Sequence, residues 1–91
     1  MQGIIKLSLT KEIILNILMQ EKYAQTRKTI YLKYNRDLST RNKGVTFHHF
    51  YEVLEDLYLT GLIQKIRIPS KYTNAVGYQI VKKGIKIMES T

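Results

Sequence analysis

The chain has 91 residues, a net charge of +8, no cysteine, and 44% hydrophobic against 24% charged residues, which allows one small core and excludes two domains and general disorder. The missing cysteines exclude disulfides and thiolate zinc sites, and no apolar run approaches the roughly 20 residues of a bilayer span. We therefore expect one cytoplasmic domain over residues 1–91, nucleoid-associated or in a host cell, with a polyanionic partner.

After a leader over residues 1–9, apolar residues at helical spacing predict a first helix over 10–22, beginning at Thr10. Glu12 would lie in its first turn, where the helix dipole favours an acid. Leu15 and Met19 lie beside the main apolar stripe, either as part of a broad core face or as a subunit contact. The stripe itself consists of Ile13, Ile14, Ile17 and Leu18.

A second helix is predicted over residues 27–40, starting after Thr26. Arg27 and Lys28 fall in its first turn, where a cation opposes the helix dipole unless a phosphate lies opposite or solvent screens it. Arg41 and Lys43 follow in the loop to the next helix. One face of the second helix would carry Ile30, Tyr31, Tyr34 and Leu38.

The clearest pattern in the chain predicts a third helix over residues 47–60. Thr46 is a suitable N-cap, because its hydroxyl can accept a hydrogen bond from an amide of the first turn, and Gly61 ends the helix. The apolar positions recur every three or four residues on one face. They are Phe47, Phe50, Val53, Leu54 and Leu57.

Alternating residues then predict a β-hairpin over 63–81. Ile66 and Ile68 alternate with Lys65 and Arg67, residues 69–75 have the composition of a turn, and Val76, Tyr78 and Ile80 alternate on the returning strand. A short final helix is expected over residues 82–90, around Ile85 and Met88, with Gly84 as a weak point inside it. The predicted fold class is thus α+β and mostly helical.

The charge is distributed unevenly along these elements. Residues 1–44 carry a net charge of +6 and residues 63–91 a net charge of +5, whereas residues 45–62 carry −3. Basic segments therefore flank the acidic third helix, as cations on either side of a nucleic-acid groove would.

This order of elements resembles the winged helix-turn-helix family, and the resemblance covers nearly the whole chain. The ending from Tyr78 to Met88 is similar to the "Tyr, x, Leu, Thr, x, x, Gly" ending of MarR-type and PadR-type transcription regulators, with Ile80 and Val81 in place of Leu-Thr and Gly84 in register. The resemblance implies three helices, a hairpin wing, a short C-terminal helix and double-stranded DNA as partner.

A second resemblance is to the C-terminal winged helix of archaeal origin-recognition initiators. It rests on Ile30-Tyr31 with Tyr34, on Val45-Thr46, and on the stretch from Leu54 to Ile63. This chain departs from that family in its wing, PSKYTNAVG, and in the pair His48-His49. Transcription regulation is therefore the first expectation, and replication initiation the alternative.

In the helix-turn-helix mode, the residues 47–60 enter the major groove and the wing lies on the adjacent backbone or minor groove. His48, Glu52 and Glu55 would point away from the core, and basic residues would hold phosphates. About six neutralised phosphates would weaken binding by roughly 10³ between 50 and 200 mM salt. The expected DNA contacts are Arg27, Lys28, Arg41, Lys43, Thr46, His48, His49, Tyr51, Glu52, Lys65, Arg67, Lys71, Tyr72 and Asn74.

Other functions remain as alternatives. The sequence shows no glycine-rich phosphate loop or nucleophile with a supporting base, so we expect no catalysis and no cofactor. Adjacent histidines without a cysteine or a third histidine are a poor metal site, and the sheet lacks an aromatic RNA-binding motif. The main rival is a protein-interaction module that docks through an acidic surface of Glu52, Glu55, Asp56 and Leu59.

We also expect a homodimer, because one small domain covers little DNA and two-fold sites are the usual remedy. Its contacts would come from Leu15 and Met19, the leader at residues 3–7, and the segment around Ile87. Nothing in the sequence indicates a small-molecule effector.

Overall fold

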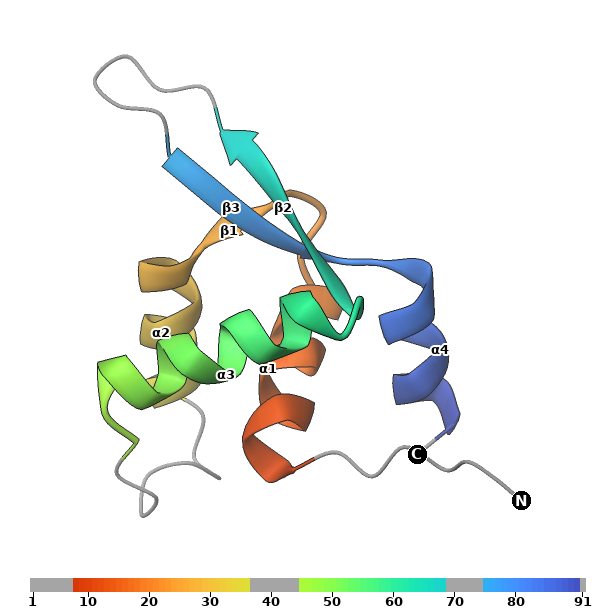
Figure 1. Cartoon of the computed structure of the whole chain (residues 1–91), viewed down its shortest axis with the longest axis horizontal. Coiled ribbons are helices and arrows are strands. Elements are labelled where there is room, and N and C mark those ends of the chain that lie inside the picture. Colours follow the sequence, from red (N-terminus) through yellow and green to blue (C-terminus); the bar gives the residue numbers. More distant parts are fainter. Residues whose placement is uncertain (1–7, 37–44, 69–74, 91) are drawn as a thin grey trace.

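The computed structural model of the chain describes residues 8–36, 45–68 and 75–90. Figure 1 shows α3 crossing in front of α1, with α2 and α4 on either side and the strands extending away from the helices. This mostly helical α+β arrangement is the fold class that the sequence predicts. In chain order the elements are α1 (Leu9–Met19), β1 (Gln25–Thr26), α2 (Arg27–Arg36), α3 (Phe47–Leu59), β2 (Ile63–Ile68), β3 (Ala75–Ile80) and α4 (Lys82–Ser90).

The sheet has three antiparallel strands in the order β1-β3-β2. The hairpin of β2 and β3 places Lys65 opposite Tyr78 and Arg67 opposite Val76. The third strand, β1, was not predicted, because two residues are too short to show an alternating pattern. It pairs Thr26 with Gly77 immediately before α2 begins. The start of α2 is thus hydrogen-bonded to the hairpin through the sheet.

One core joins the helices to the sheet. Leu15 is 0% exposed within it, so the prediction that Leu15 contacts a second subunit is wrong: its side chain is fully used in the fold. Met19 is 40% exposed, and Ile87 is partly buried against the core. The buried apolar residues are Ile13, Ile14, Leu15, Leu18, Ile30, Tyr34, Phe50, Leu54, Leu57, Leu62, Ile63 and Tyr78.

Both predicted ends of the first helix shift in the structure, and the third helix ends at Leu59, one residue before its predicted end. The first helix begins at Leu9 rather than Thr10, because the Ser8 side chain accepts a hydrogen bond from the Lys11 amide at 3.3 Å and so provides the N-cap. It ends at Met19, three residues before the predicted end. The described part of α2 ends at Arg36, and the remaining predicted positions 37–40, including Leu38, lie outside the described residues.

Both ends of α3 are capped as the sequence predicts. The Thr46 side chain accepts a hydrogen bond from the His49 amide at 3.1 Å. At the other end Gly61 has φ +80°, a conformation that side chains disfavour. The amides of Leu62 and Gly61 donate to the carbonyls of Leu57 and Tyr58, both at 3.0 Å, which is the Schellman pattern.

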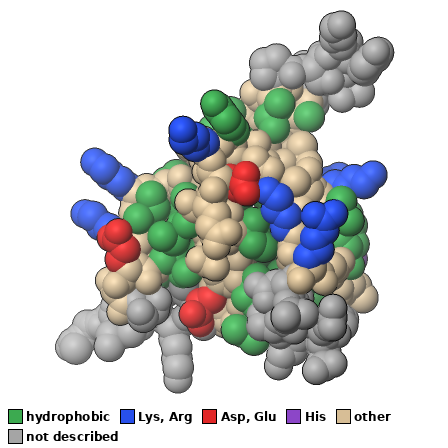
Figure 2. Space-filling model, turned by 180° about the vertical axis from the view of Figure 1, so that it is seen from behind, with side chains coloured by type: hydrophobic (Ala, Val, Ile, Leu, Met, Phe, Trp, Pro, Cys, Tyr) green, Lys and Arg blue, Asp and Glu red, His purple; other side chains and the backbone are tan. Residues whose placement is uncertain are grey.

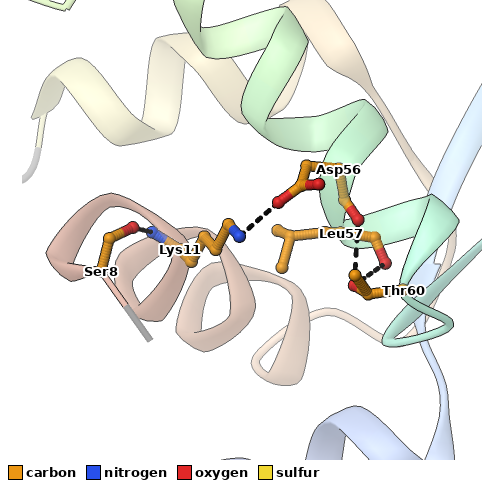
Figure 3. A network of polar contacts seen from close by, with 5 residues as sticks. All are labelled: Ser8, Lys11, Asp56, Leu57 and Thr60. Atoms are coloured by element: carbon orange, nitrogen blue, oxygen red, sulfur yellow. Dashed lines mark hydrogen bonds and ion pairs between the residues drawn. The ribbon is translucent and has the colours of Figure 1, made fainter. Parts of the chain in front are cut away.

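The C-terminal part of α3 is also fixed to α1 and capped by a side chain (Figure 3). The Lys11 ammonium on α1 forms an ion pair with Asp56. The Thr60 hydroxyl donates to the carbonyls of Asp56 and Leu57 at 2.9 and 3.1 Å. The same carbonyls also accept hydrogen bonds from the backbone amides of Thr60 and Leu62, so the hydroxyl adds a second donor to two carbonyls of the last turn.

The final helix packs closely on the turn that follows α3. The Val81 amide donates to the Leu62 carbonyl at 3.2 Å. Gly84 is buried, and a Cβ at this position would collide with the same carbonyl oxygen. Gly84 is therefore a packing requirement, in addition to being a weak helix former as the sequence indicates.

Candidate nucleic-acid interface

The N-terminal half of α3 presents polar side chains to solvent. The His48, His49 and Glu52 side chains are 85%, 60% and 63% exposed, which agrees with the expected outward direction of His48 and Glu52. A Glu52 oxygen lies 3.6 Å from His48 Nε2, and the other lies 3.9 Å from His49 Nδ1. Glu52 therefore forms ion pairs with both rings whenever they are protonated. It can orient the two imidazoles without itself contacting a polyanion.

A metal site does not arise from this cluster. Among residues 8–36, 45–68 and 75–90, no group of three His, Cys, Asp or Glu side chains is placed to hold a metal ion. The chemistry that these side chains offer is hydrogen bonding to a ligand surface.

The start of α2 lies beside this exposed part of α3. The Thr26 hydroxyl accepts a hydrogen bond from the Thr29 amide at 3.3 Å, which caps α2. The Arg27 guanidinium carbon lies 4.2 Å from the centroid of the Tyr51 ring, a cation–π contact. Arg27 and Lys28 are both exposed. The ring restricts the guanidinium while leaving its N–H groups available for an anion.

A hollow of about 550 Å³ connects these residues to the hairpin. Four of the residues that the sequence singled out as DNA contacts line it: Arg27, Lys28, Tyr51 and Lys65. They come from three elements, α2, α3 and β2. The rest of the wall is formed by Thr26, Ala75, Val76 and Tyr78.

One of the cations at the hollow is already paired. Lys65 Nζ lies 3.0 Å from Glu55 Oε1, and 4.4 Å from the centroid of the Tyr58 ring. Glu55 Oε2 accepts a hydrogen bond from the Tyr78 hydroxyl at 3.1 Å. Burial, together with that hydrogen bond and the charge of Glu55, raises the pKa of Tyr78 above its usual value. Tyr78 therefore remains a neutral donor at physiological pH.

This network was not predicted from the sequence. Glu55 was expected to point outward, whereas both its oxygens bond to the hairpin. The alternation of the strands indicated the positions of Lys65 and Tyr78 but gave no register between β2 and β3. The register places these two residues opposite each other, within reach of one carboxylate.

The remaining predicted contacts are divided between described and undescribed residues. Arg67 is exposed and has no ion pair with a described residue. Thr46 is exposed and caps α3. The other predicted DNA contacts lie outside the described residues: Arg41, Lys43, Lys71, Tyr72 and Asn74.

The acidic residues expected to form one docking surface are separated by their partners. Glu55 pairs with Lys65 on β2, whereas Asp56 pairs with Lys11 on α1. Glu52 lies with the two histidines, and Leu59 is 77% exposed at the end of α3. The four residues therefore face different neighbours, and two of the three carboxylates are paired with lysines.

Basic side chains also occur elsewhere on the surface. Figure 2 views the molecule from behind and shows Lys and Arg side chains spread over this face as well, with hydrophobic side chains between them. The overall positive charge is thus not confined to the hollow. What distinguishes the hollow is the grouping of cations beside the exposed part of α3.

No protein-family model matches the chain, and no curated protein matches it. None of the described helices is long and apolar enough to cross a bilayer.

Solved structures, in contrast, share the fold over nearly the whole chain. The zinc-responsive MarR family member ZitR from Lactococcus lactis aligns with a TM-score of 0.68 at 22% identity over 97% of this chain and 53% of its own. A PadR-like transcriptional regulator from Bacillus cereus aligns at 0.73 and 23% identity, over 88% of this chain and 74% of its own. RosR from H. salinarum aligns with a TM-score of 0.75 at 19% identity, over 97% of this chain and 73% of its own.

These likenesses confirm the winged-helix fold of MarR and PadR regulators that the sequence predicts. The chain spans about half the length of ZitR. The neighbours named by function are transcription regulators rather than enzymes.

Proposed function

We propose that this chain binds double-stranded DNA as a transcription regulator, with α3 in the major groove and the hairpin on the adjacent backbone. The observation that carries this proposal is the hollow beside α3, where Arg27, Lys28 and Tyr51 meet the strands. The regulators of the same fold support it.

Base contacts would come from the exposed N-terminal half of α3. In helix-turn-helix proteins, the N-terminal residues of the recognition helix contact base edges. His48 and His49 have ring N–H groups that suit the acceptors of guanine, and Glu52 suits the amine of cytosine. Because Glu52 lies within 4 Å of both rings, these three side chains would act as one unit.

Phosphate contacts would come from the cations that flank this half of the helix. Arg27 and Lys28 are exposed beside Tyr51, and Arg67 is exposed on β2. Such contacts fix the position of the protein on DNA without reading its sequence. The loop and wing residues Arg41, Lys43, Lys71, Tyr72 and Asn74 would extend the same set.

The functional unit would be a homodimer in the cytoplasm. A single small domain contacts too little DNA for strong specificity, and two copies would bind the two halves of a palindromic site. Met19 is 40% exposed on α1, and Ile87 lies on α4. These two residues are the remaining described candidates for the subunit contact.

Selection of bound duplexes from a random pool, followed by salt titration, tests this function. Replacing Arg27 and Lys28 together by glutamine should weaken binding to all duplexes. It should also reduce the magnitude of the negative slope of log K against log salt by about 2. Lys82→Gln with Lys86→Gln, on α4, is the control with the same change in charge and should leave the slope unchanged. Equal retention of DNA by both double variants would contradict the proposal.

The same experiment separates DNA binding from docking on another protein. A docking module that uses Glu52 and the exposed Leu59 would select no preferred duplex and would retain DNA only at low salt, through the net charge of +8. Leu59→Ala would weaken the binding of its protein partner, whereas replacing Arg27 would leave that binding unchanged.

A further inference from the structure

Among the described residues that line the hollow, Lys65 is the one basic residue that is held by a carboxylate. Two contacts direct its ammonium toward α3: the ion pair with Glu55 at 3.0 Å and the Tyr58 ring at 4.4 Å. Arg27 and Lys28 line the same hollow, and neither has an ion pair with a described residue. Lys65 therefore adds little net charge where its two neighbours add one charge each.

Glu55 is fixed in this position from its other side. Its second oxygen accepts the hydrogen bond of Tyr78, which is 2% exposed. A carboxylate that accepts from a buried hydroxyl cannot rotate into solvent without leaving that hydroxyl unpaired. Tyr78 thus anchors Glu55, and Glu55 in turn holds Lys65.

We propose that Glu55 withholds Lys65 from DNA and so limits the number of phosphates that the hairpin side of the interface neutralises. Glu55 is then a positioning residue that acts through Lys65. This inference rests on the proposed function, since it concerns how the same interface binds DNA.

The expected consequence is weaker sequence-independent binding, with the ratio of specific to nonspecific affinity unchanged. Phosphate contacts strengthen binding to every duplex equally, whereas base contacts distinguish sequences. Removing one phosphate contact lowers the sequence-independent affinity and leaves base reading by His48 and His49 intact. Glu55 would therefore reduce the time that the protein spends on unrelated DNA.

The test is a cycle of four proteins: wild type, Glu55→Gln, Lys65→Gln and the double variant. The salt slope of binding to one duplex is measured for each. Glutamine at position 55 keeps an oxygen that can accept from Tyr78 but no longer neutralises Lys65. We expect Lys65→Gln to leave the slope of the wild type nearly unchanged, and to lower the slope of Glu55→Gln by about 0.9.

The affinity should follow the same pattern. The advantage of Glu55→Gln over wild type should grow by about eightfold for each tenfold dilution of salt, because one more phosphate is neutralised. Asp56→Asn is the matched control: it removes the neighbouring charge of α3, whose partner is Lys11 on α1, and should not change the slope. Thermal unfolding of each variant verifies that the fold is kept.

Three results would overturn the inference alone. Lys65→Gln could lower the slope equally in both backgrounds, which would mean that Lys65 already contacts a phosphate. It could change neither slope, which would place Lys65 away from DNA. Asp56→Asn could change the slope as much as Glu55→Gln does. The change in net charge alone would then explain the effect, without any role for Lys65. Failure of the wild type to bind any duplex would overturn the proposed function and this inference with it.

Discussion

The two halves of α3 differ in what holds them. The N-terminal half, beyond its Thr46 cap, leaves His48, His49 and Glu52 to solvent. The C-terminal half is joined to α1 through Asp56, to both strands of the hairpin through Glu55, and to the following turn through the bonds of Gly61.

From this difference we infer that the two halves of α3 have different roles: the C-terminal half makes more polar contacts within the fold, and the N-terminal half presents polar side chains to a ligand. Core contacts hold both halves, through Phe50 in the N-terminal half and through Leu54 and Leu57 in the C-terminal half, and the polar contacts to α1 and the hairpin add to them in the C-terminal half. The polar side chains of the N-terminal half are then free to meet a ligand, and changes there should alter binding with little effect on folding. Four substitutions or conditions can test this division, taken here from the largest expected effect on stability to the smallest.

Leu57→Ala should have the largest effect. The Leu57 side chain is 0% exposed, and removing it leaves a cavity in the core, so we expect unfolding to become easier by about 2–5 kcal/mol. Leu59→Ala is a matched control, because Leu59 is 77% exposed and should cost less than about 0.5 kcal/mol. Denaturant unfolding measures both. Equal losses would mean that the C-terminal half is not anchored as described.

Gly61→Ala should destabilise the protein by about 1–2 kcal/mol, because φ at this position is +80° and a Cβ is strained there. Apart from the chain neighbours, no atom of a described residue lies within 4 Å of the added Cβ, so the loss would come from the backbone and not from a collision. Gly61→Asn should lose less, since asparagine tolerates this conformation better. If alanine and asparagine behave alike in thermal unfolding, backbone strain is not the cause.

Alkaline pH should lower the stability of the protein by breaking the contact of Tyr78 on β3 with Glu55 in the C-terminal half of α3. Because its pKa is raised in the folded protein, its contribution is complete below the unfolded pKa of about 10 and is lost as the pH rises further. The wild type should lose about 1 kcal/mol of stability between pH 10 and 11 that Tyr78→Phe does not lose. Parallel stability curves for the two proteins over this range would contradict the assignment.

The double variant His48→Ala, His49→Ala should have the smallest effect on stability, less than about 0.5 kcal/mol, since both side chains are exposed. Its affinity for a selected duplex should nevertheless fall by about 1–3 kcal/mol, with little change for unrelated DNA. Equal weakening on both kinds of DNA would mean that the histidines contact phosphates and not bases. Fluorescence anisotropy with two duplexes gives this comparison.

Much of the fold could be predicted from the sequence because its signals are local. Thr46 and Gly61 mark the ends of α3, and alternation marks β2 and β3. The predictions failed or gave nothing where the outcome depends on distant parts of the chain. Leu15 lies beside an apolar stripe that would by itself be wide enough to pack α1 on a small core. It is buried because other elements pack around α1.

The interface shows the same limit. Exposure of His48 and Glu52 follows from their place on the helix, whereas the pairing of Glu55 with Lys65 depends on how the hairpin returns to α3. The contact between Arg27 and Tyr51 likewise joins residues 24 positions apart in the sequence. The periodicity of a helix or a strand cannot predict a contact between residues so far apart in the sequence.

The short strand β1 has a mechanical consequence for the proposed interface. Thr26 pairs with Gly77 in the sheet and also caps α2, so the cation at Arg27 and the hairpin belong to one hydrogen-bonded unit. The separation between the Arg27 guanidinium and the cations of the hairpin is then set by the fold, and under the proposed function it would determine which spacing of phosphates the protein can contact. A duplex of matching groove width would be bound with little loss of conformational entropy, and a helix of different form would be rejected by distance alone.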